Sequence, residues 1–173
     1  MIQDGIIGRV STVRAWTPRN WGYDSAAPKG KDLVPEHLDW NLWFGAAFKR
    51  LDKKEIYHPG KWRNLLDYGC GTLGDTGVHI LDTLLYNALQ LDSTKTITNK
   101  CREPNGFGFP EKNEVTYQFT GTKYTTENHT WIWSDGEAPV PHEDLKLPND
   151  ETLFDQVLCL LVRKEDRIYH SFN

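Results

Sequence analysis

The chain has 173 residues, a net charge of −4 and a hydrophobic fraction of 38%. A chain of this length forms one domain, here spanning residues 1–173, with a core of ordinary size. The slightly acidic charge and the dispersed Lys and Arg argue against nucleic-acid binding, and no apolar run approaches the roughly 20 residues of a membrane span. Because the N-terminus lacks a signal-peptide pattern and the cysteines form no C-x-x-C pair, we expect a cytoplasmic protein.

The predicted elements follow a simple order along the chain. Alternating apolar and polar residues predict a first strand over residues 6–16. A long excursion rich in Pro, Gly and Trp covers residues 17–68, with a short helix or hydrophobic corner at LDWNLWFG, and a central helix follows over about residues 72–91. Over residues 94–173 the period changes to two, which predicts consecutive antiparallel strands. This order indicates an α+β fold with helices on one face of an open, mostly antiparallel sheet.

The central helix carries one polar stripe. At about 100° per residue, Asp75, His79, Asp82 and Tyr86 fall on the same face. Such a stripe is equally typical of a helix that shows its polar side to water. A cluster of glycines favours a functional interpretation, because glycine in a helical turn indicates a close approach to the backbone. These glycines are Gly69, Gly71, Gly74 and Gly77.

Residues 69–74 also satisfy the pattern G-x-G-x-x-G, and LLDYGCGT resembles the first motif of class I S-adenosylmethionine-dependent methyltransferases. Both patterns place a cofactor on the turn between a buried strand and a helix. The expected context is missing, because no partner strand precedes the glycines and Asp92 comes before the next predicted strand instead of ending it. A methyltransferase therefore stands as an alternative.

Three segments in a fixed order carry a second resemblance. They are IGRVSTVRAW, LDWNLWFG and YHPGKWRNLLDYGCGTLGDTGVHILD. Together they resemble the C-terminal domain of Gfo/Idh/MocA family oxidoreductases, in particular members with W-D-L-W-x-G and Y-H-P-G-x-W-R ahead of G-x-L-x-D-x-G-x-H-x-x-D. The resemblance covers residues 6–82 and continues more loosely to Pro148. It implies a glyceraldehyde-3-phosphate-dehydrogenase-like C-terminal domain, whose sheet often mediates dimers or tetramers.

The resemblance also assigns catalytic residues. Members pair this domain with an N-terminal Rossmann domain that binds NAD or NADP, and their D-x-x-x-H helix contacts a sugar or polyol. Those positions are Asp75 and His79. A histidine that titrates near neutrality is suited to accept a hydroxyl proton, and a carboxylate one turn away is suited to orient its ring.

The preceding motif is expected to line the same substrate pocket. Its matching residues are His58, Trp62, Arg63 and Asp67. Structural roles stay open for each of them, since Trp62 suits a core, Arg63 and Asp67 suit a surface pair or a helix cap, and His58 suits a turn. Asp75 and His79 are possible metal ligands by type, but no third ligand is evident, so no metal site is predicted.

The chain departs from the family pattern at both ends. No Rossmann domain precedes Ile6 and no E-K-P lysine is present, so we expect no cofactor to bind this chain alone, with NAD or NADP implied for a full-length parent. An excised domain, an orphan gene product and a stand-alone carbohydrate-binding or assembly module all remain open. After Asp155 the chain has an apolar run and a last strand pair within residues 157–172, which suggests a truncated sheet and a homo-oligomer formed through the sheet face.

Overall fold

The computed structural model describes residues 2–48, 50, 52–57, 59–81, 83–136, 159–164 and 167–171. Its elements are β1 (Val10–Thr17), α1 (Trp40–Phe44), the 3-10 helix η1 (Lys61–Asn64), α2 (Gly71–Ile80), α3 (Thr83–Ala88), β2 (Thr94–Lys100), β3 (Asn113–Thr120), β4 (Thr125–Asp135), β5 (Cys159–Lys164) and β6 (Arg167–Ser171). Within these ranges, no helix has the length and apolar character needed to cross a membrane.

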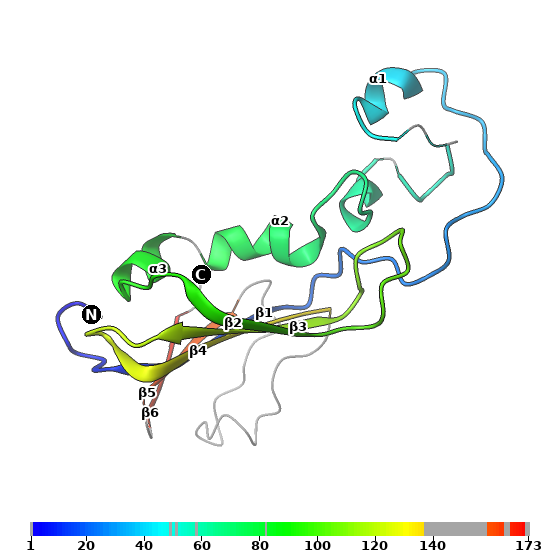
Figure 1. Ribbon diagram of the computed structural model, residues 1–173. Coiled ribbons are helices and arrows are strands. Elements are labelled where there is room, and N and C mark those ends of the chain that lie inside the picture. Colours follow the sequence, from blue (N-terminus) through cyan, green and yellow to red (C-terminus); the bar gives the residue numbers. More distant parts are fainter. Residues whose placement is uncertain are drawn as a thin grey trace, which may run out of the picture.

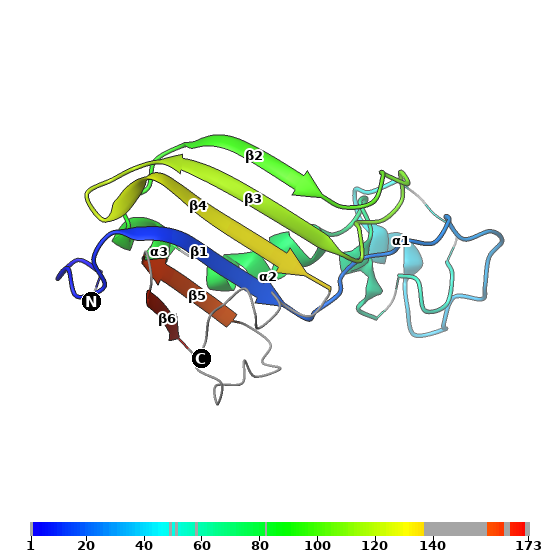
Figure 2. The same ribbon diagram turned by 90° about the horizontal axis from the view of Figure 1, so that it is seen from below.

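The described strands form one six-stranded sheet with the order β2-β3-β4-β1-β5-β6 (Figure 2). Neighbouring strands are antiparallel except for β1 and β4, which run parallel. The prediction of a mostly antiparallel α+β fold is therefore confirmed, and so is the last strand pair, which forms β5 and β6. What the alternating pattern did not predict is that β1 lies inside the sheet, between β4 and β5.

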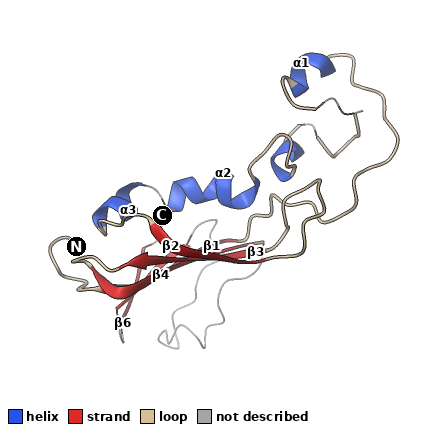
Figure 3. Ribbon diagram, in the orientation of Figure 1, coloured by secondary structure: helices blue, strands red, loops and turns tan. Residues whose placement is uncertain are grey.

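Helices α2 and α3 lie on one face of the sheet, as predicted, whereas α1 lies beyond its end (Figures 1 and 3). The prediction of one continuous helix over about residues 72–91 is wrong. Helix α2 ends where the Leu81 N–H bonds to the Gly77 carbonyl at 2.7 Å, and Asp82 lies outside the described residues. After α3, Gln90 has a φ of 52°, a left-handed conformation that no helix continues through.

The core lies between this helix layer and the sheet. Val13 and Ala15 of β1 pair in register with Trp131 and Trp133 of β4, and all four side chains are buried. The strand predicted from residue 6 begins only at Val10, because the preceding residues form turns at Gly5 and Gly8, both with a φ of 73°. The two tryptophans of β4 therefore fill the core.

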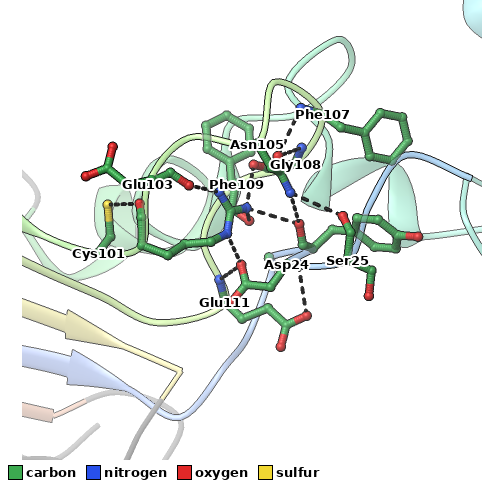
Figure 4. Close-up of polar contacts among 12 residues, drawn as sticks. Asp24, Ser25, Cys101, Glu103, Asn105, Phe107, Gly108, Phe109 and Glu111 are labelled. Atoms are coloured by element: carbon green, nitrogen blue, oxygen red, sulfur yellow. Dashed lines mark hydrogen bonds and ion pairs between the residues drawn. The ribbon is translucent and has the colours of Figure 1, made fainter.

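The excursion is fastened to the loop that follows β2 (Figure 4). The Arg102 guanidinium donates to the carbonyl oxygens of Tyr23 (3.1 Å), Gly108 (2.9 Å) and Phe109 (3.1 Å), and it pairs with the Asp24 carboxylate. Asn105 binds the same two segments, because its Nδ2 donates to the carbonyl oxygens of Tyr23 and Ser25, and its Oδ1 accepts from the backbone of Phe107 and Gly108. Two polar side chains thus hold residues 23–25 against residues 102–109.

A fully buried histidine lies beside the parallel strand pair. His129 is 0% exposed, and its Nδ1 is 3.1 Å from the Val10 carbonyl oxygen. Its ring packs against Phe119 and Trp131, and its Nε2 has no hydrogen-bond partner in the described part of the chain. Burial lowers the pKa of His129, because the charged imidazolium is poorly solvated there, although its backbone hydrogen bonds oppose this effect.

The buried His129 predicts that acid destabilises the fold. The pKa of His129 is lower in the folded state than in the unfolded state. Between these two pKa values the unfolded chain therefore binds more protons than the folded chain, so the free energy of unfolding falls as the pH falls below about 6.5. We expect the free energy of unfolding in urea to fall between pH 7.5 and pH 5 by more in the wild type than in His129→Gln. Taking the difference between the two proteins cancels the contributions of the other titrating groups. An equal pH dependence of the free energy of unfolding in both proteins would contradict the proposed effect of His129.

Candidate functional site

Helix α2 presents its predicted catalytic residues away from the sheet. Thr72 and Thr76 are buried, whereas Asp75 is half-buried and His79 is exposed. The Thr72 hydroxyl accepts a hydrogen bond from the Trp21 backbone N–H at 2.8 Å, which ties the start of the helix to the excursion. The helix is therefore fixed through its threonine side, and the side with Asp75 and His79 is available for a ligand.

Asp75 is linked to the segment that precedes the glycines. Its Oδ1 accepts from Arg63 Nε at 3.3 Å, and the two side chains are 29% and 34% exposed. Among the described residues no hydrogen bond joins Asp75 to His79, so the predicted orienting contact is replaced by a contact with Arg63. At this exposure the ion pair is worth little as stabilisation, and its effect is to set the position of the carboxylate.

The Arg63 guanidinium lies over the rings of two tryptophans. Its Cζ is 4.4 Å from the centre of the Trp62 ring and 5.8 Å from that of Trp21, both within the range of cation–π attraction. The sequence predicted Arg63 and Trp62 for the pocket but missed Trp21, which lies more than 40 residues away in the excursion. An isolated tryptophan in a polar, Pro-rich loop was the available signal.

Two members of the glycine cluster, Gly69 and Gly71, allow the segment before α2 to pack closely against neighbouring parts of the protein. A Cβ on Gly69 would collide with the backbone of Arg63, so η1 rests directly on the start of α2. Gly71 has a φ of 65°, and its Cβ would lie 2.8 Å from the Phe109 ring. The glycines allow close packing within the protein, and the residues before them form η1 instead of the buried strand that a dinucleotide or methyltransferase cradle requires.

An aromatic pocket of about 300 Å³ lies next to Arg63, because Trp62, whose ring contacts the Arg63 guanidinium, is part of its wall. Its walls include two of the predicted residues, Trp62 and Asp67, together with residues that sequence reasoning did not assign to a site. The latter are Trp43, Phe44, Ala47 and Tyr68.

Local structure explains how the aromatic wall is held. The Asp39 carboxylate caps α1 by accepting from two backbone N–H groups, which fixes the first turn. Trp40 stacks on Trp43 with ring centres 4.7 Å apart and planes 8° from parallel. Trp40 Nε1 also donates to the Arg50 carbonyl oxygen at 2.8 Å. These contacts hold Trp40 in place, and Trp40 in turn fixes the position of Trp43 in the pocket wall.

Asp67 is the acidic group of this pocket. It pairs with Arg50, which the sequence did not single out, whereas Arg63 pairs with Asp75, so the Arg63–Asp67 surface pair that the sequence left open is not formed. Burial raises the pKa of Tyr68 and Tyr57 nearby, so both phenols stay neutral hydrogen-bonding groups at physiological pH. His58, the remaining predicted pocket residue, lies outside the described residues.

The glycine-rich turn before α2 is packed against other parts of the protein. A Cβ at Gly71 would meet the Phe109 ring, and a Cβ at Gly69 would meet the backbone of Arg63, so this turn leaves no space for a dinucleotide. Nor does any group of three or more His, Cys, Asp or Glu side chains lie together for a metal ion within the described ranges.

Comparison with known proteins gives one family. The chain matches the oxidoreductase family, C-terminal alpha/beta domain (GFO_IDH_MocA_C2), over residues 1–138. A comparison with curated proteins produced no match. The matched range includes every strand and helix that builds the site, from β1 to β4. The chain therefore belongs to this oxidoreductase family and forms its C-terminal alpha/beta domain.

Proposed function

We propose that this chain is the substrate-side domain of an NAD(P)-dependent sugar or polyol oxidoreductase and does not turn over alone. The observation that carries the proposal is the Arg63–Asp75 contact, which joins the W-R segment to the D-x-x-x-H helix. Through it, the aromatic pocket, Trp62, Arg63 and Asp75 form one continuous strip that leads to His79.

The residues of the strip have complementary roles in this proposal. Oxidation of a carbinol requires its hydroxyl proton to leave, and the exposed His79 ring is suited to accept it. Asp75, held by Arg63, accepts a hydrogen bond from a neighbouring hydroxyl. The aromatic walls beside Trp62 offer apolar faces to the C–H side of a sugar ring, and the Asp67 carboxylate offers an acceptor to its hydroxyls.

The nicotinamide cofactor belongs to a separate domain in this proposal, which is supported by the close packing of the glycine-rich turn against Phe109 and Arg63. The test is to fuse or mix the chain with a Rossmann domain of the same family and to follow reduced nicotinamide with a panel of aldoses and cyclic polyols. Turnover that requires both parts supports the proposal. Turnover by this chain alone, or none with any fused Rossmann domain despite folded protein, contradicts it.

The aromatic pocket favours a second candidate function, a carbohydrate-binding module without catalysis. Trp43, Tyr68 and Asp67 alone provide a platform and an acceptor. Calorimetric binding of a sugar that is lost in Trp43→Ala but unchanged in His79→Ala, together with inactive fusions, would favour this candidate.

Self-association through the sheet face opposite the helices is a further prediction. The register places Thr98, Thr116 and Ile132 side by side on that face, because the neighbouring Trp131 and Trp133 face the helix layer. We expect an oligomer with a dissociation constant at or below the micromolar range, measured by analytical ultracentrifugation. Thr116→Arg should dissociate it, whereas Asn87→Arg on the helix side should not. A wild-type monomer at all concentrations would contradict the prediction.

A further inference from the structure

A second cavity lies between the first turn of α2 and the sheet. Its volume is about 500 Å³, and its lining comes from the first turn of α2, from β2 and β3, and from the end of β4. None of the residues proposed above for substrate or proton transfer lines it. Its lining consists of Cys70, Gly71, Thr72, Leu73, Gly74, Ile97, Asn99, Cys101, Phe109, Pro110, Asn113, Val115, Tyr117 and Asp135.

The wall of this cavity contains a buried carboxyl group, that of Asp135. The residue is 3% exposed, and its Oδ2 accepts from Trp133 Nε1 at 2.6 Å. Its Oδ1 has no hydrogen-bond partner among the described residues. Asn113, which pairs with Asp135 across β3 and β4, also has an Oδ1 without a partner. Two acceptor oxygens on neighbouring strands thus lack a donor, which is costly in a buried position unless a ligand or water supplies one.

The charge of the cavity lining limits the kind of ligand that can supply the missing hydrogen-bond donor. Among the described lining residues Asp135 is the only carboxylic acid, none is Lys, Arg or His, and the other titratable groups are Cys70, Cys101 and Tyr117. Burial raises the pKa of Asp135 to about 6, against the opposing effects of the Trp133 hydrogen bond and of the nearby Asn113 amide group. At pH 7.5 the carboxylate is still mostly ionised, and no Lys, Arg or His side chain among the described lining residues balances its charge.

The rest of the cavity lining is mainly apolar. Phe109 and Tyr117 contribute aromatic surface, and Val115 and Leu73 contribute aliphatic surface. Ile97 on β2 is 58% exposed, which leaves the cavity open to small molecules on that side. A carboxylate among aromatic faces and amide oxygens is the chemistry that recognises an organic cation, through charge-assisted hydrogen bonds and cation–π attraction.

We propose that the cavity between α2, β2, β3 and the end of β4 binds a small organic compound with a primary ammonium group, held by Asp135 and Asn113. A neutral polyol also supplies donors, but it leaves the carboxylate charge uncompensated in an apolar site. An ammonium group supplies hydrogen-bond donors and compensates the carboxylate charge at once. This site is separate from the strip that ends at His79.

The test compares two probes of the same shape, cyclohexylammonium and cyclohexanol, with the chain as it exists and no nicotinamide. At pH 7.5 we expect the ammonium probe to bind at least tenfold more tightly by calorimetry, and Asp135→Asn to remove that preference. Binding of the ammonium probe should also weaken as the pH falls below about 6 and Asp135 takes up its proton. Val78→Ala, on the exposed side of α2 away from the cavity lining, is the control and should leave both affinities unchanged.

A second readout does not depend on the Asp135 variant. Cys70 and Cys101 are exposed free thiols in the cavity lining, so the bound ammonium probe should slow their alkylation, resolved by peptide mass mapping. Equal affinity for the two probes, or full binding by Asp135→Asn, overturns the proposal, and so does unchanged alkylation at saturating probe. Because no catalytic assay is involved, these outcomes are independent of the oxidoreductase proposal.

Discussion

Replacing His79 by alanine is expected to lower turnover of the two-domain enzyme by about 10²–10⁴-fold, the range that removal of a positioned proton acceptor usually costs. The reason is that His79 is the exposed titratable group at the end of the strip formed by Trp62, Arg63 and Asp75. The measurement is the steady-state rate with a fused Rossmann domain, with kcat and KM separated, since loss of a proton acceptor acts mainly on kcat.

The matched control for this experiment is Val78→Ala. Val78 precedes His79 on the same exposed side of α2 and is 61% exposed, so its truncation should change stability by less than about 0.5 kcal/mol and leave turnover intact. If His79→Ala retains wild-type kcat while Val78→Ala behaves as expected, the proton-accepting role of His79 is wrong. If both variants lose activity, the helix itself has been disturbed.

Arg102→Ala should destabilise the domain by about 2–4 kcal/mol, because several hydrogen bonds from one charged group are lost and the freed carbonyls are partly buried. The side chain binds Asp24 and the carbonyls of Tyr23, Gly108 and Phe109, so its loss also releases the excursion that places Trp21 beside Arg63. Urea unfolding measures the first effect, and the second appears as weaker sugar binding.

Lys100→Ala provides the comparison for Arg102→Ala. Lys100 forms an ion pair with Glu114 at 2.8 Å, but its side chain is 84% exposed, so its removal should cost less than about 1 kcal/mol. Equal destabilisation by the two substitutions would show that Arg102 acts as a surface charge and does not fasten the excursion.

Much of the sheet could be predicted because its signals are local. The alternation within residues 94–135 located β2, β3 and β4, and the turn residues between them fixed their antiparallel order. The parallel pairing of β1 with β4 has no local signal, because it depends on which distant strand completes the core. The break between α2 and α3 was missed for a similar reason, since the apolar periodicity continues across it.

The sequence brought together residues that lie near one another in the structure, but it did not predict which of them pair. Ordered motifs identified Trp62, Arg63, Asp67 and Asp75, yet the sequence suggested a pair between Arg63 and Asp67 where the structure pairs Arg63 with Asp75. Ion pairs between partly exposed side chains are decided by the path of the backbone, and here that path depends on the close contact of Gly69 with Arg63. The contact between Trp21 and Arg63 has no local signal in the sequence, because it depends on where the long excursion returns to the rest of the protein.

The internal position of β1 has a consequence for the order of folding. The first strand of the chain meets its parallel partner only after more than a hundred residues have intervened, since His129 contacts the Val10 carbonyl across a separation of 119 residues. Closing so long a loop has an entropic cost that no local contact offsets, which slows folding. During synthesis β1 therefore waits as an unpaired apolar strand, and β2, β3 and β4 are expected to assemble first as the template on which it docks.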